Sequence, residues 1–149
     1  MNEEIEEFLY REELELATIF KRAMAAAIDD TILSVLLVII LFDSLSSLQS
    51  AEQMVTFVNS FMLEFIIIKI IYHLIFTTLY GATAGKMVMK IRVIEISTAT
   101  NPTWNVSLNR SIFRIVSEMF FYLGFLWGMM DPNRQTWQDK TAKTLVINA

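Results

Sequence analysis

The sequence predicts an all-α polytopic membrane protein with two full transmembrane helices, a broken or re-entrant third apolar segment and a small cytoplasmic β element. Two apolar segments, 23–42 and 54–80, are long enough to cross a hydrocarbon core of roughly 30 Å at about 1.5 Å per residue. A third apolar segment, 107–130, is interrupted by charges and glycines. The short run 90–96 is rich in β-branched residues, as strands are.

Composition places the 149 residues in a single membrane-bound domain. Hydrophobic residues make up 54% of the chain and charged residues 19%, against about 45–50% and 25% in an average soluble domain. There is no cysteine and one histidine, so disulfides and thiolate metal sites are excluded. We therefore expect no cofactor, no metal site and no enzyme activity. Outside the first fifteen residues acids and bases nearly balance, so we expect no nucleic-acid partner.

The segment 1–20 predicts an acidic amphipathic helix. Seven glutamates fall within its first fifteen residues, and apolar residues recur between them at near-helical spacing. An anionic membrane surface would repel such a helix. We favour docking of its apolar face against the rest of the protein, and the alternative is a handle for a protein partner.

Lysine and arginine residues set the expected orientation of the chain. The polar loop 43–53 contains no base, whereas bases precede the first span, follow the second span in the loop 81–105 and recur in the tail 131–149. The positive-inside rule therefore places the N-terminus, the loop 81–105 and the tail on the cytoplasmic face. Three full spans would put the tail on the opposite face of the membrane from the N-terminus, which contradicts this assignment. We expect 107–130 to bend near Gly124 as a hairpin whose turn is buried in protein.

The loop 81–105 predicts a turn followed by a strand. Gly81 and Gly85 should break the helix where the chain leaves the membrane, and the β-branched run 90–96 follows them. The closing segment 144–147 is a second short strand that could pair with this run. The GATAGK motif differs from a phosphate-binding loop in its spacing and in the residue after the lysine, so a glycine turn explains it better.

Ionisable side chains inside the apolar segments are candidates for an ion path. They are Glu64, Lys69, His73, Arg114 and Glu118. Lys69 and His73 lie four residues apart on one helix face, whereas Glu64 lies about 140° from Lys69. The plainer interpretation is a set of satisfied contacts, such as pairing of Arg114 with Glu118. The functional interpretation rests on the cost of placing ionisable groups at that depth.

A second candidate site is an ion-pair cluster of Arg22, Asp29 and Asp139. Arg22 and Asp29 are seven residues apart, about two helical turns, and project from nearly the same face. If Arg22 lies at the interface, Asp29 lies roughly 10 Å deeper. Asp139 belongs to a tail assigned to the same side. A guanidinium group can bridge two carboxylates, so we expect the cluster to pin the tail to the first span.

Three segments, in this order, resemble the RDD family, a group of small, mostly prokaryotic membrane proteins named for one arginine and two aspartates. RAMAAAIDD resembles the family's opening, with Arg22 as the arginine and Asp29 as the first aspartate. GATAGKMVMKIRVI resembles its central glycine–lysine loop, although Ala84 stands where a proline is common. DPNRQTWQDKTAKTLVI resembles its closing segment, with Asp139 as the second aspartate. The resemblance covers nearly the whole chain after residue 16 and implies a bacterial inner (cytoplasmic) membrane protein.

The resemblance leaves two function classes open. Some RDD proteins are linked to cation/proton antiport, and in that class Asp29, Glu64 and Asp139 would exchange protons or cations. So short a chain has too few spans for alternating access alone, so transport requires a homo-oligomer. The alternative is a structural or assembly subunit that binds a larger membrane complex in the lipid bilayer. We favour transport because of the family association.

Overall fold

The computed structural model describes residues 3–149 and consists of helices with one small sheet. In chain order the elements are α1 (Glu3–Arg11), α2 (Ile19–Ile40), α3 (Phe42–Ser46), α4 (Ala51–Ser60), α5 (Met62–Tyr80), α6 (Ala84–Val88), β1 (Ile91–Glu95), α7 (Trp104–Met119), α8 (Leu123–Met130), α9 (Trp137–Ala142) and β2 (Thr144–Asn148).

Two helices, α2 with 22 residues and α5 with 19, are long and apolar enough to cross a membrane. The pair α7 and α8 meets the same criterion only together, and the two helices are bent by 101° at the break between them. The predicted fold class, with two full spans, a broken third segment and a small sheet, is therefore confirmed. The first span begins at Ile19, earlier than expected, because the Thr18 hydroxyl caps the helix by accepting from the backbone N–H of Lys21 at 3.2 Å.

The second apolar segment is two helices instead of the continuous span predicted over 54–80. The backbone leaves helical geometry at Phe61, which separates α4 from α5. Just before the break, the hydroxyl of Ser60 donates to the carbonyl of Phe57 at 2.7 Å. Such side-chain bonds compete with the backbone hydrogen bonds of a helix and bend it, which is a reason for the break at this point.

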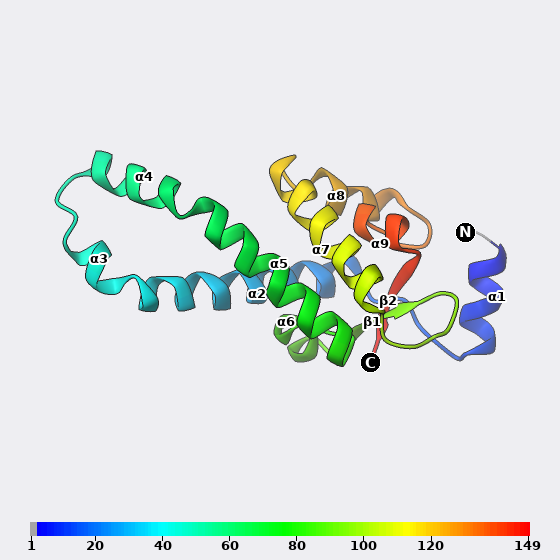
Figure 1. The fold of residues 1–149 in the computed structure, drawn as a ribbon. Coiled ribbons are helices and arrows are strands. Elements are labelled where there is room, and N and C mark those ends of the chain that lie inside the picture. The colour runs from blue at the N-terminus through cyan, green and yellow to red at the C-terminus, as the bar shows by residue number, and fades with distance from the viewer. Residues whose placement is uncertain (1–2) are drawn as a thin grey trace.

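The elements divide the molecule into an open end and a compact end. Figure 1 shows α2 and α5 running together to a tip formed by α3 and α4, while α1, the sheet and α9 gather at the opposite end. α2 packs mainly on α6, and α5 packs mainly on α7, so contact between the two long helices is sparse. The amino-terminal helix, the central loop and the tail thus share one end of the molecule, as the distribution of bases predicted.

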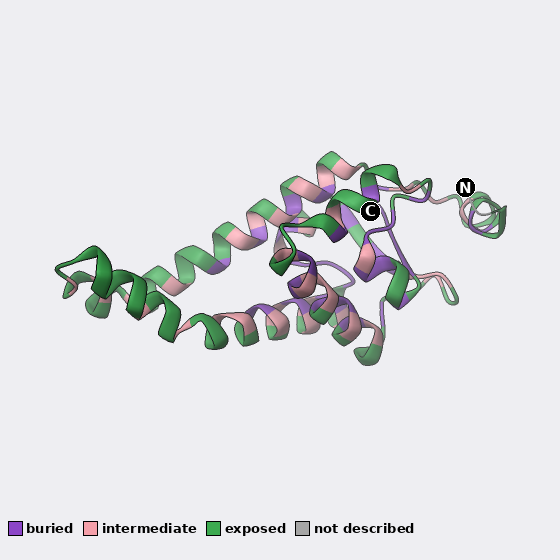
Figure 2. Cartoon of the chain, turned by 90° about the horizontal axis from the view of Figure 1, so that it is seen from above, coloured by how far each residue is buried: buried purple, intermediate pink, exposed green. Residues whose placement is uncertain are grey.

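Burial follows the same division. Residues near the tip are exposed along all faces of their helices, while buried positions concentrate at the compact end (Figure 2). Large apolar side chains such as Ile39, Phe42 and Leu63 are about two-thirds exposed, at 66%, 63% and 67%. Contiguous apolar exposure on a helix long enough to span a bilayer identifies a surface in contact with lipid or with another membrane helix.

The predicted pairing of the two short strands is confirmed. β1 and β2 run antiparallel, with Val93 opposite Val146 in the middle of the register. Most of their side chains are buried, although Arg92 is exposed, and α1 covers one face of this small sheet. Ile5 and Phe8 of α1 form an apolar core with Ile94, Leu145 and Ile147.

The acidic helix therefore docks against its own protein, as we favoured, but it is shorter than predicted. It ends at Arg11, and the following segment is extended. Leu16 forms an isolated bridge with Ile147, and the N–H of Ala17 donates to the carbonyl of Val146 at 2.9 Å. Pairing with the sheet supplies partners for backbone groups that a longer helix would have satisfied internally.

The third apolar segment bends at residues 120–122, near Gly124 as predicted, but Gly124 itself does not make the turn. Phe121 and Tyr122 have positive φ angles of 53° and 60°, and the N–H of Tyr122 donates to the carbonyl of Ser117 at 2.8 Å. Gly124 lies inside α8, where a Cβ would come within 2.7 Å of the Trp137 ring. The glycine thus permits close packing of α8 on α9, and the turn is made by other residues.

Candidate functional site

Asp139 is the centre of a buried ion-pair cluster at the compact end. It lies in the first turn of α9, is fully buried, and accepts hydrogen bonds from the guanidinium groups of Arg22 in α2 and Arg110 in α7. Thr136 donates to the same carboxylate through its backbone N–H at 3.0 Å and its hydroxyl at 2.8 Å. Arg110 also donates to the hydroxyl of Thr144 at the start of β2. We call Arg22, Arg110 and Asp139 the clamp.

The electrostatics of the clamp keep Asp139 ionised. Burial alone would raise the pKa of the Asp139 carboxyl, because it disfavours the charged form. The positive charges of Arg22 and Arg110 and the hydrogen bonds from Thr136 outweigh burial and hold this pKa well below its usual range. The clamp therefore stays intact throughout the neutral and mildly acidic range.

The expected pairing of Arg22 with Asp139 is confirmed, but Asp29 does not belong to this cluster. The Asp29 carboxylate accepts from the Tyr72 hydroxyl at 2.7 Å, the Thr83 hydroxyl at 2.6 Å and the backbone N–H of Gly85 at 2.8 Å. It lies two turns deeper than Arg22, roughly 10 Å along α2, so one guanidinium group cannot serve both aspartates. Neutral donors from α5 and α6 satisfy it instead.

Gly85 brings α6 against α2 at this point. A Cβ on Gly85 would lie 2.1 Å from the backbone oxygen of Ala25 and 2.9 Å from the Asp29 carboxylate. Only glycine permits so close an approach. Both glycines were predicted to break the helix. Gly85 does not, because it lies inside α6, whereas Gly81 does, because it ends α5 with a φ of 68°.

A second group of charges, the four-charge network, joins α2, α5 and α7. The Lys69 ammonium lies 3.1 Å from an Asp30 oxygen and 2.5 Å from a Glu118 oxygen. Arg114 contacts Glu118 at 3.2 Å and the same Asp30 oxygen at 3.7 Å. Two carboxylates thus face two cations within the apolar part of the chain. The Asp30 side chain remains 30% exposed, so the network reaches the protein surface.

The other two residues proposed for an ion path lie outside the four-charge network. Glu64 is exposed on α5 and forms no ion pair with any residue of 3–149. His73 is buried on α5, and its Nε2 has no hydrogen-bond partner within the described chain. The structure therefore brings together Lys69, Arg114 and Glu118 from the predicted set. Between residues 3 and 149, no group of three or more His, Cys, Asp or Glu residues is placed to hold a metal ion.

Three residues that were not among the candidate site residues complete these sites. Arg110 was recognisable, because Arg110, Arg114 and Glu118 advance by fours along one polar stripe of α7. Asp30 was visible as an intramembrane carboxylate turned away from Asp29. Tyr72 gave no signal, because a tyrosine in an apolar helix is an ordinary residue and its partner lies 43 positions away.

Comparison with known proteins gives one family and a few distant relatives. The model of the RDD family matches residues 16–143. The proline-rich antigen of Mycobacterium leprae (strain TN) is 33% identical over 67 residues, which are 45% of this chain and 27% of the relative. A proline-rich antigen homolog of Mycobacterium tuberculosis (strain ATCC 25618 / H37Rv) is 28% identical over 67 residues, 45% of this chain and 28% of the relative. The chain thus matches little more than a quarter of the length of these relatives. No solved structure matches this chain.

Proposed function

Because this chain belongs to the RDD family of membrane proteins, we propose that it exchanges a monovalent cation for a proton as a homo-oligomer in a bacterial inner membrane, with its amino-terminal helix and tail in the cytoplasm. The observation that supports this proposal is the four-charge network of Asp30, Lys69, Arg114 and Glu118. Ionisable groups at membrane depth are costly, and in membrane proteins such groups line ion paths and proton relays.

The exchange follows from the position of the Lys69 ammonium between two carboxylates. The two carboxylates favour the charged form of Lys69, so Lys69 releases its proton only as a monovalent cation takes its place beside Asp30 and Glu118. A monovalent cation that binds these carboxylates restores the charge, and reprotonation of Lys69 expels it. One proton leaves for each cation that enters, so the charge of the network is conserved. Arg114 holds Glu118 in place and remains charged throughout.

The network needs more than one copy of the chain to serve as a path across a membrane. Each copy contributes two full spans and one bent pair of helices. Secondary transporters place their ion sites between repeated bundles that rock against one another. In an assembly of this chain, copies related by symmetry take the place of such repeats, and the partly exposed Asp30 faces the path between them.

The proposal is tested with purified protein in liposomes that contain a pH-sensitive dye. A pulse of external sodium or potassium should alkalinise the lumen as the cation gradient drives an opposite proton flux through the wild type. Asp30→Asn and Glu118→Gln should abolish this signal, while Glu64→Gln, which removes an exposed and unpaired carboxylate of the same helix bundle, should retain it. Wild-type rates in a folded Asp30→Asn variant would exclude the network as the exchange site.

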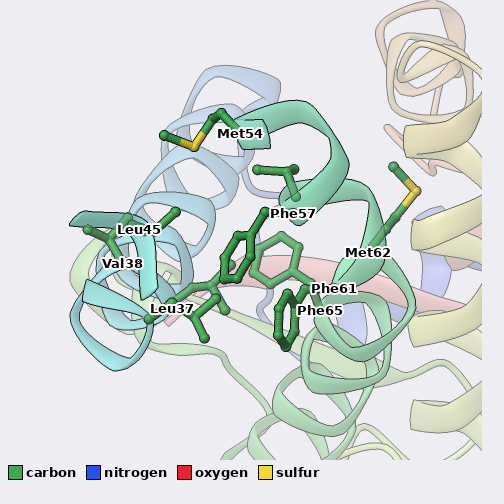
Figure 3. Close-up of a pocket in the computed structure, with 10 residues that line it drawn as sticks. Leu37, Val38, Leu45, Met54, Phe57, Phe61, Met62 and Phe65 are labelled. Carbon is green, nitrogen blue, oxygen red and sulfur yellow. The ribbon is translucent and has the colours of Figure 1, made fainter. Parts of the chain in front are cut away.

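An assembly role is the second candidate, and an apolar hollow between the long helices favours it. This hollow has a volume of about 410 Å³ and lies towards the tip of the molecule. Figure 3 shows the rings of Phe57, Phe61 and Phe65 turned into it. The lining residues are Leu37, Val38, Leu41, Leu45, Met54, Phe57, Val58, Phe61, Met62 and Phe65. A transmembrane helix of another protein would bury this surface.

The two candidates differ in what the protein binds in mild detergent. Light scattering after gel filtration gives the mass of the isolated assembly, and mass spectrometry identifies its components. A homo-oligomer supports exchange by copies of this chain. A stoichiometric complex with a different membrane protein supports the assembly role instead.

A further inference from the structure

A small polar cavity lies between α5, α6, α7 and α9. Its position differs from those of the ion pairs that make up the clamp and the four-charge network. Its volume is about 20 Å³, which is room for one particle of about the size of a water molecule. The polar side chains that matter for its chemistry are His73, Lys86, Arg110, Ser111, Arg114 and Gln138.

The lining of this cavity is strongly positive. Three basic side chains, Lys86, Arg110 and Arg114, face it and no carboxylate does. Arg110 shares its only carboxylate, Asp139, with Arg22, so the clamp carries a surplus positive charge. Within residues 3–149, no carboxylate lies within 4.0 Å of the Lys86 ammonium. Positive charges removed from water need a counter-charge. The carboxylates of Asp29 and Asp139 act on Lys86 from outside the cavity, and both already accept hydrogen bonds from other groups.

Unused hydrogen-bonding groups also face the cavity. His73 is only 4% exposed, and its Nε2 has no partner within the described chain. The buried Nη2 of Arg114 makes no hydrogen bond either, although it lies 3.7 Å from Asp30. A guanidinium N–H and an imidazole protonated at Nε2 are both donors, and the carboxamide of Gln138 adds two more when its NH₂ group faces inward.

We propose that this cavity binds a monatomic halide, chloride in the cell, between Lys86, Arg110, Arg114 and His73. One anion neutralises the surplus charge and accepts from the donors that have no partner. The volume admits a monatomic ion, and sulfate or phosphate, with four oxygens around a central atom, is too large for it. This site is separate from the cation site of the proposed exchange, so each can fail without the other.

Lys86 couples this site to pH. Burial, together with the nearby positive charges of Arg110 and Arg114, lowers the pKa of the Lys86 ammonium to about 7. A bound anion favours the charged form, so halide binding takes up a proton as Lys86 becomes charged. The titratable and charged groups around it are His73 from α5, Arg110 and Arg114 from α7, Asp29 from α2 and Asp139 from α9. Affinity for the halide should therefore fall as the pH rises through 7.

The test uses the full chain in detergent and compares sodium chloride with sodium gluconate at equal ionic strength. Chloride at ten times its Kd should raise the midpoint of thermal unfolding by about 3 to 5 °C. Between pH 6 and pH 8 the apparent Kd should rise about tenfold, since the charged fraction of Lys86 falls by that factor. Lys86→Gln should remove both effects. Arg92→Gln, which deletes an exposed positive charge on β1, should leave both unchanged.

A second variant covers the case in which Lys86→Gln fails to fold. Ser111→Val keeps every charge and fills the cavity with a larger apolar side chain, so it should also abolish the chloride-dependent shift. Wild-type protein with the same midpoint in chloride and gluconate would overturn the proposal. A full chloride response in folded Lys86→Gln or Ser111→Val would overturn it as well, because the anion would then bind elsewhere.

Discussion

Arg22, at the start of the first span, donates to the carboxylate of Asp139 in α9 and to the backbone carbonyl of Arg134 in the segment before α9. Both guanidinium contacts fasten the carboxyl-terminal part of the chain to α2. Arg110 approaches the same carboxylate from α7, so the clamp ties three helices together at one buried point.

The clamp predicts that Asp139→Asn destabilises the protein strongly. Removing the carboxylate charge leaves Arg22 and Arg110 buried without their counter-charge, and breaking a buried pair in this way costs about 3 to 5 kcal/mol. Thermal unfolding in detergent measures the loss. Asp43→Asn, which neutralises an exposed aspartate of α3, serves as control and should behave like the wild type. Equal stability of the two variants would contradict a structural role for the clamp.

The low pKa of Asp139 predicts how that stability depends on pH. A carboxyl group whose pKa is lower in the folded than in the unfolded protein stabilises the fold at every pH above the unfolded value of about 4. Its contribution is lost as the pH falls below that value towards the folded pKa. The difference in stability between wild type and Asp139→Asn should therefore stay constant from pH 7 to about pH 5 and shrink below pH 4. A difference that shrinks already between pH 7 and pH 6 would argue against the clamp.

Gly85→Ala should separate α6 from α2. The new methyl group would lie 2.1 Å from the backbone oxygen of Ala25, so α6 must move away and weaken the hydrogen bond from residue 85 to Asp29. Overpacking of this kind costs about 1 to 3 kcal/mol. Gly128→Ala is the matched control, because its methyl group would lie 3.0 Å from the Thr136 methyl group and no closer than 3.5 Å to a backbone atom, so it should cost less. The midpoints of thermal unfolding of the two variants measure their losses of stability. A larger loss of stability in Gly128→Ala than in Gly85→Ala would be inconsistent with the close packing of α6 on α2.

The docking of α1 predicts that Phe8→Ala destabilises the sheet. Phe8 packs against Ile94 and Leu145, and truncating a buried phenylalanine costs about 3 kcal/mol or more. Hydrogen exchange of the β1 and β2 amides should accelerate in this variant. Tyr10→Ala provides the comparison, since Tyr10 is 89% exposed on the same helix. Unchanged exchange in Phe8→Ala, together with loss of a co-purifying protein, would favour the alternative that α1 is a partner handle.

The arrangement of the ends predicts the result of labelling in intact cells. The chain has no cysteine, so Ser46→Cys and Lys143→Cys each introduce a single reactive thiol. Ser46 lies in α3 at the tip and Lys143 precedes β2 at the compact end. A membrane-impermeant thiol reagent added outside should label only the first variant. Labelling of both positions would require a third full span through α7 and α8.

Sequence reasoning reached those features that depend on composition and short-range pattern. The spans follow from the length of their apolar runs, and the strands follow from β-branched residues at 91–95 and 144–148, where the structure has them. Adjacent residues of a helix project about 100° apart, and the adjacent aspartates Asp29 and Asp30 do bind different partners.

The features that it missed depend on tertiary contacts. Phe121 and Tyr122 adopt positive φ angles that are uncommon for aromatic residues, so nothing in their identity marks the bend. The partners of Asp29 are uncharged: Tyr72 comes from α5, Thr83 precedes α6, and Gly85 lets the backbone of α6 approach α2. The charge of Asp29 suggested a charged partner, but three neutral hydrogen-bond donors satisfy its carboxylate.

The clamp has a consequence for the order in which the chain is made. Arg22 and Asp139 are 117 positions apart. A ribosome that adds about 5 to 20 residues per second needs roughly 6 to 23 s to pass from the arginine to its partner. During that interval α2 enters the bilayer with its guanidinium group unpaired, and water at the membrane boundary must solvate it. The final locking of the first helix is therefore one of the last events in the biogenesis of this fold.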